Sequence, residues 1–297
     1  MRTTELKQNK TFSPKQVARA LGVSEASIKR WCDKGILPFT KTAGGHRRLS
    51  LHVVLEFVRK NEFILAQPEV LGLPTSVGSG SRTLDQACRL YRQALEQGDE
   101  ARCLQLVFDM RLAGHDMAVI GDRVIAPAFH ELGQRWEHGE TAVYQERRGV
   151  EITRHILLRI KDTLAPPDPA APTAVGATLP GDPYSLPGLL CELVLLEMGW
   201  QARFLGSDLP METVARAVED LRPRMLWLSI SSLDEPGHFI EDYLRLYEIC
   251  LRYQSAVVVG GRALTSSVRQ QLPYASYGDN LQHLRGFAQS LYRRSSE

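Results

Sequence analysis

The sequence has few cysteines and no long apolar run, and each shortage excludes a class of protein. The five cysteines among 297 residues are scattered without a C-x-x-C pair, which argues against a disulfide framework and a zinc site of that kind. No stretch of about 18 apolar residues occurs that would cross a membrane. The first residues are polar and basic, without the apolar centre of a secretory signal. We therefore expect a cytoplasmic protein that does not enter a membrane.

Motifs for common catalytic chemistry are also missing. The sequence contains neither G-x-S-x-G nor G-x-x-x-x-G-K-[ST], and no acid–base pair stands out among its scattered aspartates and glutamates. Hydrophobic residues nevertheless make up 43% of the chain, enough for two or three globular units. These observations predict a multidomain binding protein and not an enzyme.

The near-neutral total charge of +2 hides a strong asymmetry along the chain. Residues 1–66 hold 13 lysines and arginines against five acidic residues, a balance of +8. The other 231 residues hold 23 against 29, a balance of −6. A basic head on an acidic body is typical of a protein whose head alone meets polyanionic DNA.

The basic head begins with a helix-turn-helix pattern. Ser13 is a suitable N-cap for a helix starting at Pro14, and Gln16 is placed to complete a capping box. Gly22 suits a tight turn, and Ser24 is placed to cap a second helix. In helix-turn-helix proteins this second helix lies in the major groove, so it is the predicted recognition helix.

A predicted hairpin follows the helix pair. We expect Ile28 and Trp31 of the second helix to face inward, and Lys29 and Arg30 to face outward. The pair Gly44 and Gly45 then joins two short extended segments into a wing. The predicted wing carries further side chains suited to phosphates or the minor groove: Lys41, His46, Arg47 and Arg48.

The head resembles the winged helix-turn-helix of MerR-type transcription regulators and the related excisionases. Over about sixty residues the resemblance rests on the helix pair, residues 34–38 and the segment Gly45, His46, Arg47, Arg48, although Leu49 stands where an aromatic residue often closes the wing. It implies a dimer bound to repeated half-sites in double-stranded promoter DNA. It also implies DNA contacts from six residues: Ser24, Lys29, Arg30, His46, Arg47 and Arg48.

The rest of the chain divides into a helical and a mixed segment. Residues 67–82 and 164–173 have the composition of a flexible and a proline-rich linker, respectively. Between them, residues 83–163 show helical periodicity and predict a four-helix bundle. Residues 174–297 alternate short apolar runs at 174–179, 202–205, 225–230 and 256–259 with helical segments starting near Pro187, Pro210, Pro236 and Leu281. The predicted class is multidomain α and α/β, ending in a doubly wound parallel sheet.

Small, polar and glycine-rich loops follow the predicted strands. Ligands of doubly wound sheets bind beyond the carboxyl ends of the strands, which makes these loops the candidate site. The loops span residues 180–185, 206–210, 229–232 and 260–262. Ordinary strand-to-helix turns are the competing interpretation.

The body resembles the cobalamin-binding module of light- and cobalamin-sensing MerR-type regulators, methionine synthase and the corrinoid mutases. The matching segments are 206–210, 228–231, 259–261 and Trp136 followed by Glu146 in the bundle. The resemblance implies a helical cap over a Rossmann-like domain, with eight candidate cofactor-binding residues: Trp136, Glu146, Asp182, Tyr184, Ser229, Ser231, Gly260 and Gly261. The mutases and methyltransferases add a substrate domain for which this chain has no room.

The family motif Asp-x-His-x-x-Gly reads differently here. Asp182 matches, but Tyr184 replaces the cobalt-ligating histidine, and Glu137 stands where the photoreceptors carry a second one. Because a phenol must lose its proton before it binds cobalt, imidazole-ligated cobalamin is not expected, and no metal ligand is assigned. Three interpretations remain open: cobalamin without a protein ligand, haem or another tetrapyrrole, and a scaffold for oligomerisation and partner contact only.

The sequence thus predicts a DNA-binding transcription regulator that works as a dimer or tetramer. Its cobalamin-binding-like body is expected to control oligomerisation. An adaptor without direct DNA contact is the alternative from another functional class.

Overall fold

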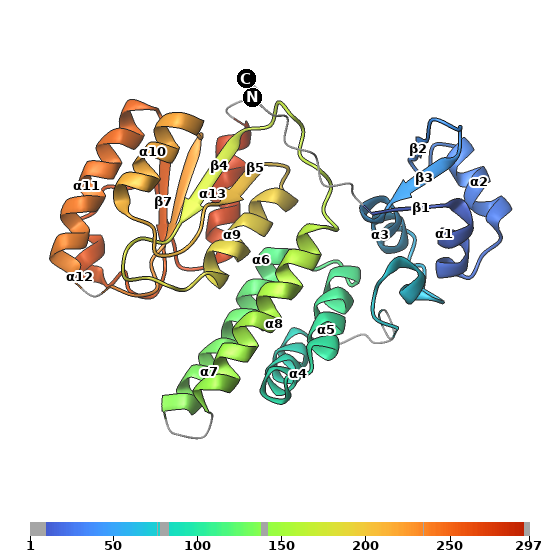
Figure 1. The fold of residues 1–297 in the computed structure, drawn as a ribbon, viewed down its shortest axis with the longest axis horizontal. Coiled ribbons are helices and arrows are strands. Elements are labelled where there is room, and N and C mark those ends of the chain that lie inside the picture. The colour runs from blue at the N-terminus through green and yellow to red at the C-terminus, as the bar shows by residue number, and fades with distance from the viewer. Residues whose placement is uncertain (1–9, 76, 78–82, 138–141, 234, 294–297) are drawn as a thin grey trace. The chain divides into compact units, whose positions relative to one another are not determined.

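The computed structural model describes residues 10–75, 77, 83–137, 142–233 and 235–293 (Figure 1). The chain folds into two compact units. The first unit extends to His115 and takes up again at Pro127–Ala165, and the second unit joins Asp116–Ala126 to the segment that starts at Pro166. The third helical segment of the predicted bundle is therefore shared between the units.

The head is a winged helix-turn-helix. Its elements are β1 (Thr11–Phe12), α1 (Pro14–Leu21), α2 (Glu25–Asp33), β2 (Thr40–Lys41), β3 (Arg47–Ser50) and α3 (Leu51–Lys60). The three strands form an antiparallel sheet in the order β1-β3-β2. Apolar side chains from every helix and from β3 meet in a solvent-excluded core that includes Val17, Ile28, Leu49 and Val54.

The predicted helix signals of the head are present as hydrogen bonds. The Ser13 hydroxyl accepts from the Gln16 amide, and the Gln16 side chain accepts from the Ser13 amide, which completes the capping box. Gly22 ends α1 with φ +67°, and the Ser24 hydroxyl accepts from the Ser27 amide at the start of α2. Helix α1 thus begins and ends where the sequence predicts, and α2 also begins at its predicted position after Ser24.

The first half of the predicted flexible linker is packed against the head. Residues Pro68–Leu71 form a 3₁₀ turn, and Leu71 and Leu73 are buried. The amides of Ala66 and Gln67 also donate to the Ala20 carbonyl at the end of α1. The composition wrongly predicts flexibility for this half of the linker. Its prolines and glycines form a tight turn, and two buried leucines anchor that turn to the head. Residues 76 and 78–82 of this linker lie outside the described residues.

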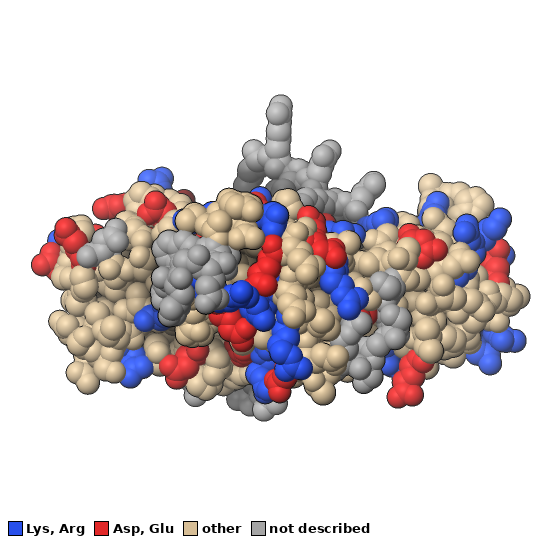
Figure 2. All heavy atoms as spheres, turned by 90° about the horizontal axis from the view of Figure 1, so that it is seen from below, with Lys and Arg blue, Asp and Glu red and all other residues tan. Residues whose placement is uncertain are grey.

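The helical segments that follow are α4 (Leu84–Gln97), α5 (Glu100–Leu112), α6 (Met117–Ile120), η2 (Gly121–Ile125), α7 (Ala126–Glu137) and α8 (Val143–Lys161). The sequence predicts four segments, and their positions agree with the periodicity. The third segment, however, is interrupted by η2, a π-helical turn, and α6 and η2 belong to the second unit. Figure 2 shows acidic and basic side chains lying next to one another in the middle of the face drawn.

The second unit contains a five-stranded parallel sheet. Its strands are β4 (Thr173–Ala177), β5 (Gln201–Phe204), β6 (Met225–Ser229), β7 (Ala256–Gly260) and β8 (Ser276–Gly278), in the order β5-β4-β6-β7-β8. The connecting helices are α9 (Leu186–Glu197), α10 (Met211–Leu221), α11 (Pro236–Arg252), α12 (Ser266–Arg269) and α13 (Leu281–Arg293). The sequence predicts this doubly wound sheet, except for β8 and α12.

Helices cover both faces of the sheet because alternate strand residues point to opposite sides (Figure 1). On one face, residues such as Val175, Leu226 and Val257 pack with α10, α11 and α12. On the other, Ala174, Trp227 and Val258 pack with α9 and α13. Among the described residues, no helix is long and apolar enough to cross a membrane.

Candidate functional site

The recognition helix α2 presents its basic side chains to solvent. Lys29 and Arg30 are exposed, whereas Ile28 on the same turn is fully buried. Lys29 forms an ion pair of 2.8 Å with Glu25 one turn earlier. Ser24 caps the helix, so its hydroxyl lies at the N-terminus, the end that approaches base edges in helix-turn-helix proteins.

The wing is a tight hairpin. The Thr42 amide donates to the His46 carbonyl, the Gly45 amide donates to the Thr42 carbonyl, and Gly45 has φ +78°. Lys41 and His46 are exposed. At the right of Figure 2 the head carries several exposed basic side chains, with acidic side chains among them.

Arg47 and Arg48 lie on strand β3 and not at the tip of the wing. Because strand residues alternate, Arg47 shares a face with buried Leu49, and Arg48 lies on the other face. The Arg47 guanidinium donates to the Lys29 carbonyl at 2.9 Å and pairs with Asp33 at 2.7 Å. In the structure Arg47 thus links the wing back to α2, and its DNA contact stays a prediction.

Asp182 is the centre of the hydrogen-bond network beyond the sheet. It follows β4, which neighbours β6 at the point where the strand order reverses. The carboxylate is buried and accepts from the Tyr184 amide at 3.1 Å, the Ser231 amide at 2.5 Å and the Ser232 amide at 3.4 Å. Burial raises the pKa of this carboxyl, and these hydrogen bonds oppose the rise. Asp182 therefore joins the loops after β4 and β6.

Two residues outside the predicted set extend this network to a third loop. The Thr178 hydroxyl accepts from the Asp208 amide at 2.8 Å, and the Asp208 carboxylate accepts from the Gly181 amide at 2.9 Å. Asp208 has φ +54°, which ordinary residues adopt rarely. The sequence singles out the loop that contains Asp208, but it does not reveal this left-handed backbone.

Tyr184 is half-buried, and its ring lies beneath the Arg262 guanidinium at 5.4 Å. The Arg262 Nε also donates to the Ser231 carbonyl at 3.1 Å. The side chain at this position is therefore a phenol held beside a cation, not an imidazole. Among the described residues, no cluster of three or more His, Cys, Asp or Glu side chains is suited to hold a metal ion. Residues 180–185 contain no histidine, so this loop itself offers no imidazole.

Other predicted cofactor residues have structural roles that the sequence does not reveal. Ser229 is buried in β6, and Ser231 contributes backbone groups to the network. A side chain at Gly260 would overlap the Gly278 carbonyl, and Gly261 has φ +120° against the Ile230 carbonyl. The two glycines are thus required by close backbone approach, with or without a ligand.

Trp136 and Glu146 lie on different helices of the first unit. Trp136 is in the last turn of α7, and Glu146 is in the first turn of α8, where it pairs with Arg147 at 3.5 Å. The segment between these helices, residues 138–141, lies outside the described residues. The cofactor role of both residues stays a prediction.

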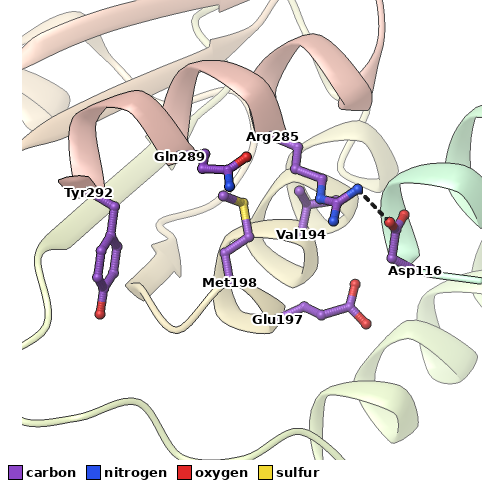
Figure 3. A pocket seen from close by; sticks show the side chains of 7 residues that line it. All are labelled: Asp116, Val194, Glu197, Met198, Arg285, Gln289 and Tyr292. Carbon is purple, nitrogen blue, oxygen red and sulfur yellow. Dashed lines mark ion pairs between the residues drawn. The ribbon is translucent and has the colours of Figure 1, made fainter.

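An open pocket of 360 Å³ lies in the second unit, away from the sheet-edge loops (Figure 3). Val194 and Glu197 of α9 and its C-cap Met198 line it opposite Arg285, Gln289 and Tyr292 of α13. Asp116 pairs with Arg285 at 2.7 Å, and Glu197 accepts from the Met117 amide at 2.8 Å. These contacts attach the start of α6 to the sheet unit.

Two family models match separate parts of the chain, and two curated proteins are similar to most of it. A helix-turn-helix domain model matches residues 11–62, and a B12 binding domain model matches residues 88–161. The HTH-type transcriptional repressor CarA of Myxococcus xanthus is 28% identical over 84% of this chain and 86% of its own length. CarH of the same organism is 27% identical over 86% of this chain and 91% of its own length.

A solved structure supports the fold of the body. The Methanosarcina barkeri monomethylamine corrinoid protein superposes with a TM-score of 0.57, covering 68% of this chain and 96% of its own at 18% identity. The chain therefore joins a segment that matches a helix-turn-helix domain model to a helical segment that matches a B12 binding domain model, and over most of its length it is similar to HTH-type transcriptional repressors.

Proposed function

We propose that this protein is a transcription regulator that binds double-stranded promoter DNA through its winged head and assembles as a homo-oligomer through its body. The observation that carries the proposal is the exposed basic surface made by α2 and the wing, in a domain that a helix-turn-helix model matches. The whole-chain similarity to two repressors supports regulation over catalysis.

The proposed DNA surface consists of Ser24, Lys29, Arg30, Lys41, His46 and Arg48. Lysine and arginine at these positions supply phosphate contacts, which dominate affinity and make it salt-dependent. The acidic balance of the remaining chain keeps the body away from the same polyanion. Binding should therefore depend on the head and weaken steeply with salt.

Gel-shift and fluorescence titrations with promoter fragments test this proposal. Replacing Arg30 by alanine should weaken binding about tenfold, in the range of one lost charged contact. Arg59, an exposed arginine on α3 outside the proposed surface, is the matched control, and R59A should bind like the wild type. Equal loss in both variants, or no binding by the wild type, would reject the proposed surface.

We propose further that the body binds a corrinoid without an imidazole ligand from the loop after β4. The B12 binding domain match supports corrinoid binding. The phenol of Tyr184, which lies beside Arg262, supports binding without an imidazole ligand from this loop. When bound, the group would supply a large flat surface and a cobalt centre. Asp182 and Thr178 would hold the three loops in place around it.

The absorption spectrum of protein incubated with adenosylcobalamin and then desalted tests this step. A retained corrin band in the wild type, unchanged in Y184F, is the expected result, because no ligation by the phenol is proposed. Loss of the band in Y184F would identify Tyr184 as a ligand. Retention of haem and not of cobalamin would assign a different tetrapyrrole, and retention of neither would leave assembly as the role of the body.

A further inference from the structure

Arg47 is more firmly engaged within the protein than the other wing cations. Its guanidinium bonds the Lys29 carbonyl and the Asp33 carboxylate, and it lies 5.1 Å from the centre of the Phe39 ring. Only 25% of its side chain is exposed. These partners come from the middle and the last residue of the recognition helix α2 and from the segment that leads into the wing.

Two of these contacts join the wing to the recognition helix, and the third joins it to the segment between α2 and β2. Pairing with β1 and the buried Leu49 hold β3, whereas β2 is only two residues long and lies at the edge of the sheet. A guanidinium has a planar fork of donors, which allows it to bond a carbonyl and a carboxylate and to stack on a ring simultaneously. Arg47 thus acts across 18 residues of sequence.

We propose that Arg47 is a positioning residue that holds the wing at the angle required for DNA binding, and that it does not itself contact DNA. This inference rests on the proposed function of the head. It separates Arg47 from Arg48, although the two are adjacent and chemically identical. Arg48 lies on the opposite face of β3 and keeps the phosphate-binding role.

The substitution D33A distinguishes this positioning role from a direct DNA contact, because the two roles predict opposite effects on DNA affinity. Asp33 is 61% exposed and carries a negative charge on the DNA-binding head. If Arg47 bound phosphate, D33A would release the arginine and remove repulsion, so binding would strengthen. If Arg47 positions the wing, D33A removes one of its anchors, and binding weakens despite the lost negative charge.

The test compares the full-length wild type with R47A, R47K, D33A, the double variant R47A/D33A and R48A. Each is titrated with a labelled mixed-sequence duplex of about 30 base pairs between about 50 and 200 mM salt. We expect R47A to bind about tenfold more weakly with an unchanged salt slope, R47K to resemble R47A, and D33A to bind about threefold more weakly. The double variant should be no weaker than R47A.

R48A should instead lower the magnitude of the salt slope by about 0.9, the value for one lost phosphate contact. Stronger binding by D33A, or the same fall in slope in R47A, would overturn the proposal. Amide hydrogen exchange at Thr42 and Gly45 gives a readout without DNA, and R47A and D33A should accelerate it while R48A does not. If the wild type bound no duplex, the proposed function would fail, and this exchange experiment would still decide whether Arg47 braces the wing.

Discussion

Single buried residues decide how the loops beyond the sheet are held. Asp182 accepts three backbone amides, so D182A leaves three donors of the β4 and β6 loops without their partner. We expect D182A to lower the free energy of unfolding by about 3 kcal/mol. D182N keeps one acceptor oxygen and should cost about half as much. Denaturant titration of both variants checks this prediction, and equal stability of D182A and the wild type would contradict it.

The half-buried Asp122 and the buried Asp182 also predict a pH dependence of stability. Burial raises the pKa of both carboxyls above 3.8, against the effect of their backbone hydrogen bonds. The folded chain therefore binds their protons more tightly than the unfolded chain. Their contribution to stability is fully present below pH 3.8 and is lost as the pH rises through the raised values. The double variant D122N/D182N should show a flatter fall in unfolding free energy than the wild type across this window.

The Trp227 ring fits into the core of the sheet because Gly176 has no side chain. A Cβ at this position would overlap the Trp227 ring, which is buried on the neighbouring strand. We expect G176A to destabilise the protein by about 3 kcal/mol through overpacking. A Cβ at Gly133 on α7 would meet no other atom within 4 Å, so G133A should be neutral or stabilising by up to about 1 kcal/mol. Thermal unfolding of both variants makes the comparison, and a G176A protein as stable as G133A would contradict it.

At the scale of elements, the π-helical turn η2 supplies the cap of a distant helix. The Asp122 carboxylate accepts from the Leu281 and Gln282 amides at the start of α13, at 2.9 and 3.1 Å. Together with the Asp116–Arg285 pair, this contact places α6 and η2 in the sheet unit. A segment that reads as part of the bundle is therefore structurally part of the sheet domain.

Removing this cap should loosen α13 before it affects the rest of the sheet. We expect D122A to cost about 1–2 kcal/mol, in the range of a lost N-cap. Amide exchange at Leu281 and Gln282 should accelerate, while amides of β6 keep their protection. D279A, at an exposed aspartate just before α13, is the matched control. Unchanged exchange at Leu281 and Gln282 in D122A would show that the cap contributes nothing.

At the scale of the whole molecule, the basic charge is concentrated in the head, so the salt dependence of DNA affinity measures how many heads bind DNA. Four basic side chains of the proposed surface, Lys29, Arg30, Lys41 and Arg48, are available for phosphate contacts in each head. The slope of log K against log salt should be about −4 for one bound head and about −7 for two. Titration beside light scattering of the complex tests whether the slope and the number of bound chains agree. A slope near −4 from a bound dimer would mean that only one head touches DNA.

The local structure and the domain types follow from the order of the amino acids alone. The caps at Ser13 and Ser24, the turn at Gly22 and the alternating apolar pattern of the sheet depend on neighbouring residues, which a sequence displays directly. The positions of the loops after the strands follow from the same pattern. The short strand β8 escapes prediction because three half-buried residues leave almost no pattern.

The roles of individual polar side chains depend instead on the folded chain. Arg47 and Arg48 read alike, yet the face of β3 that packs on the core turns Arg47 to Asp33. Asp182 meets Ser231 across 49 residues, and Asp122 meets Leu281 across 159. Such contacts form because folding brings distant backbone amides to a carboxylate that is buried or half-buried and needs partners. Periodicity predicts which residues are buried, but the choice of partners follows from the packing of the whole chain.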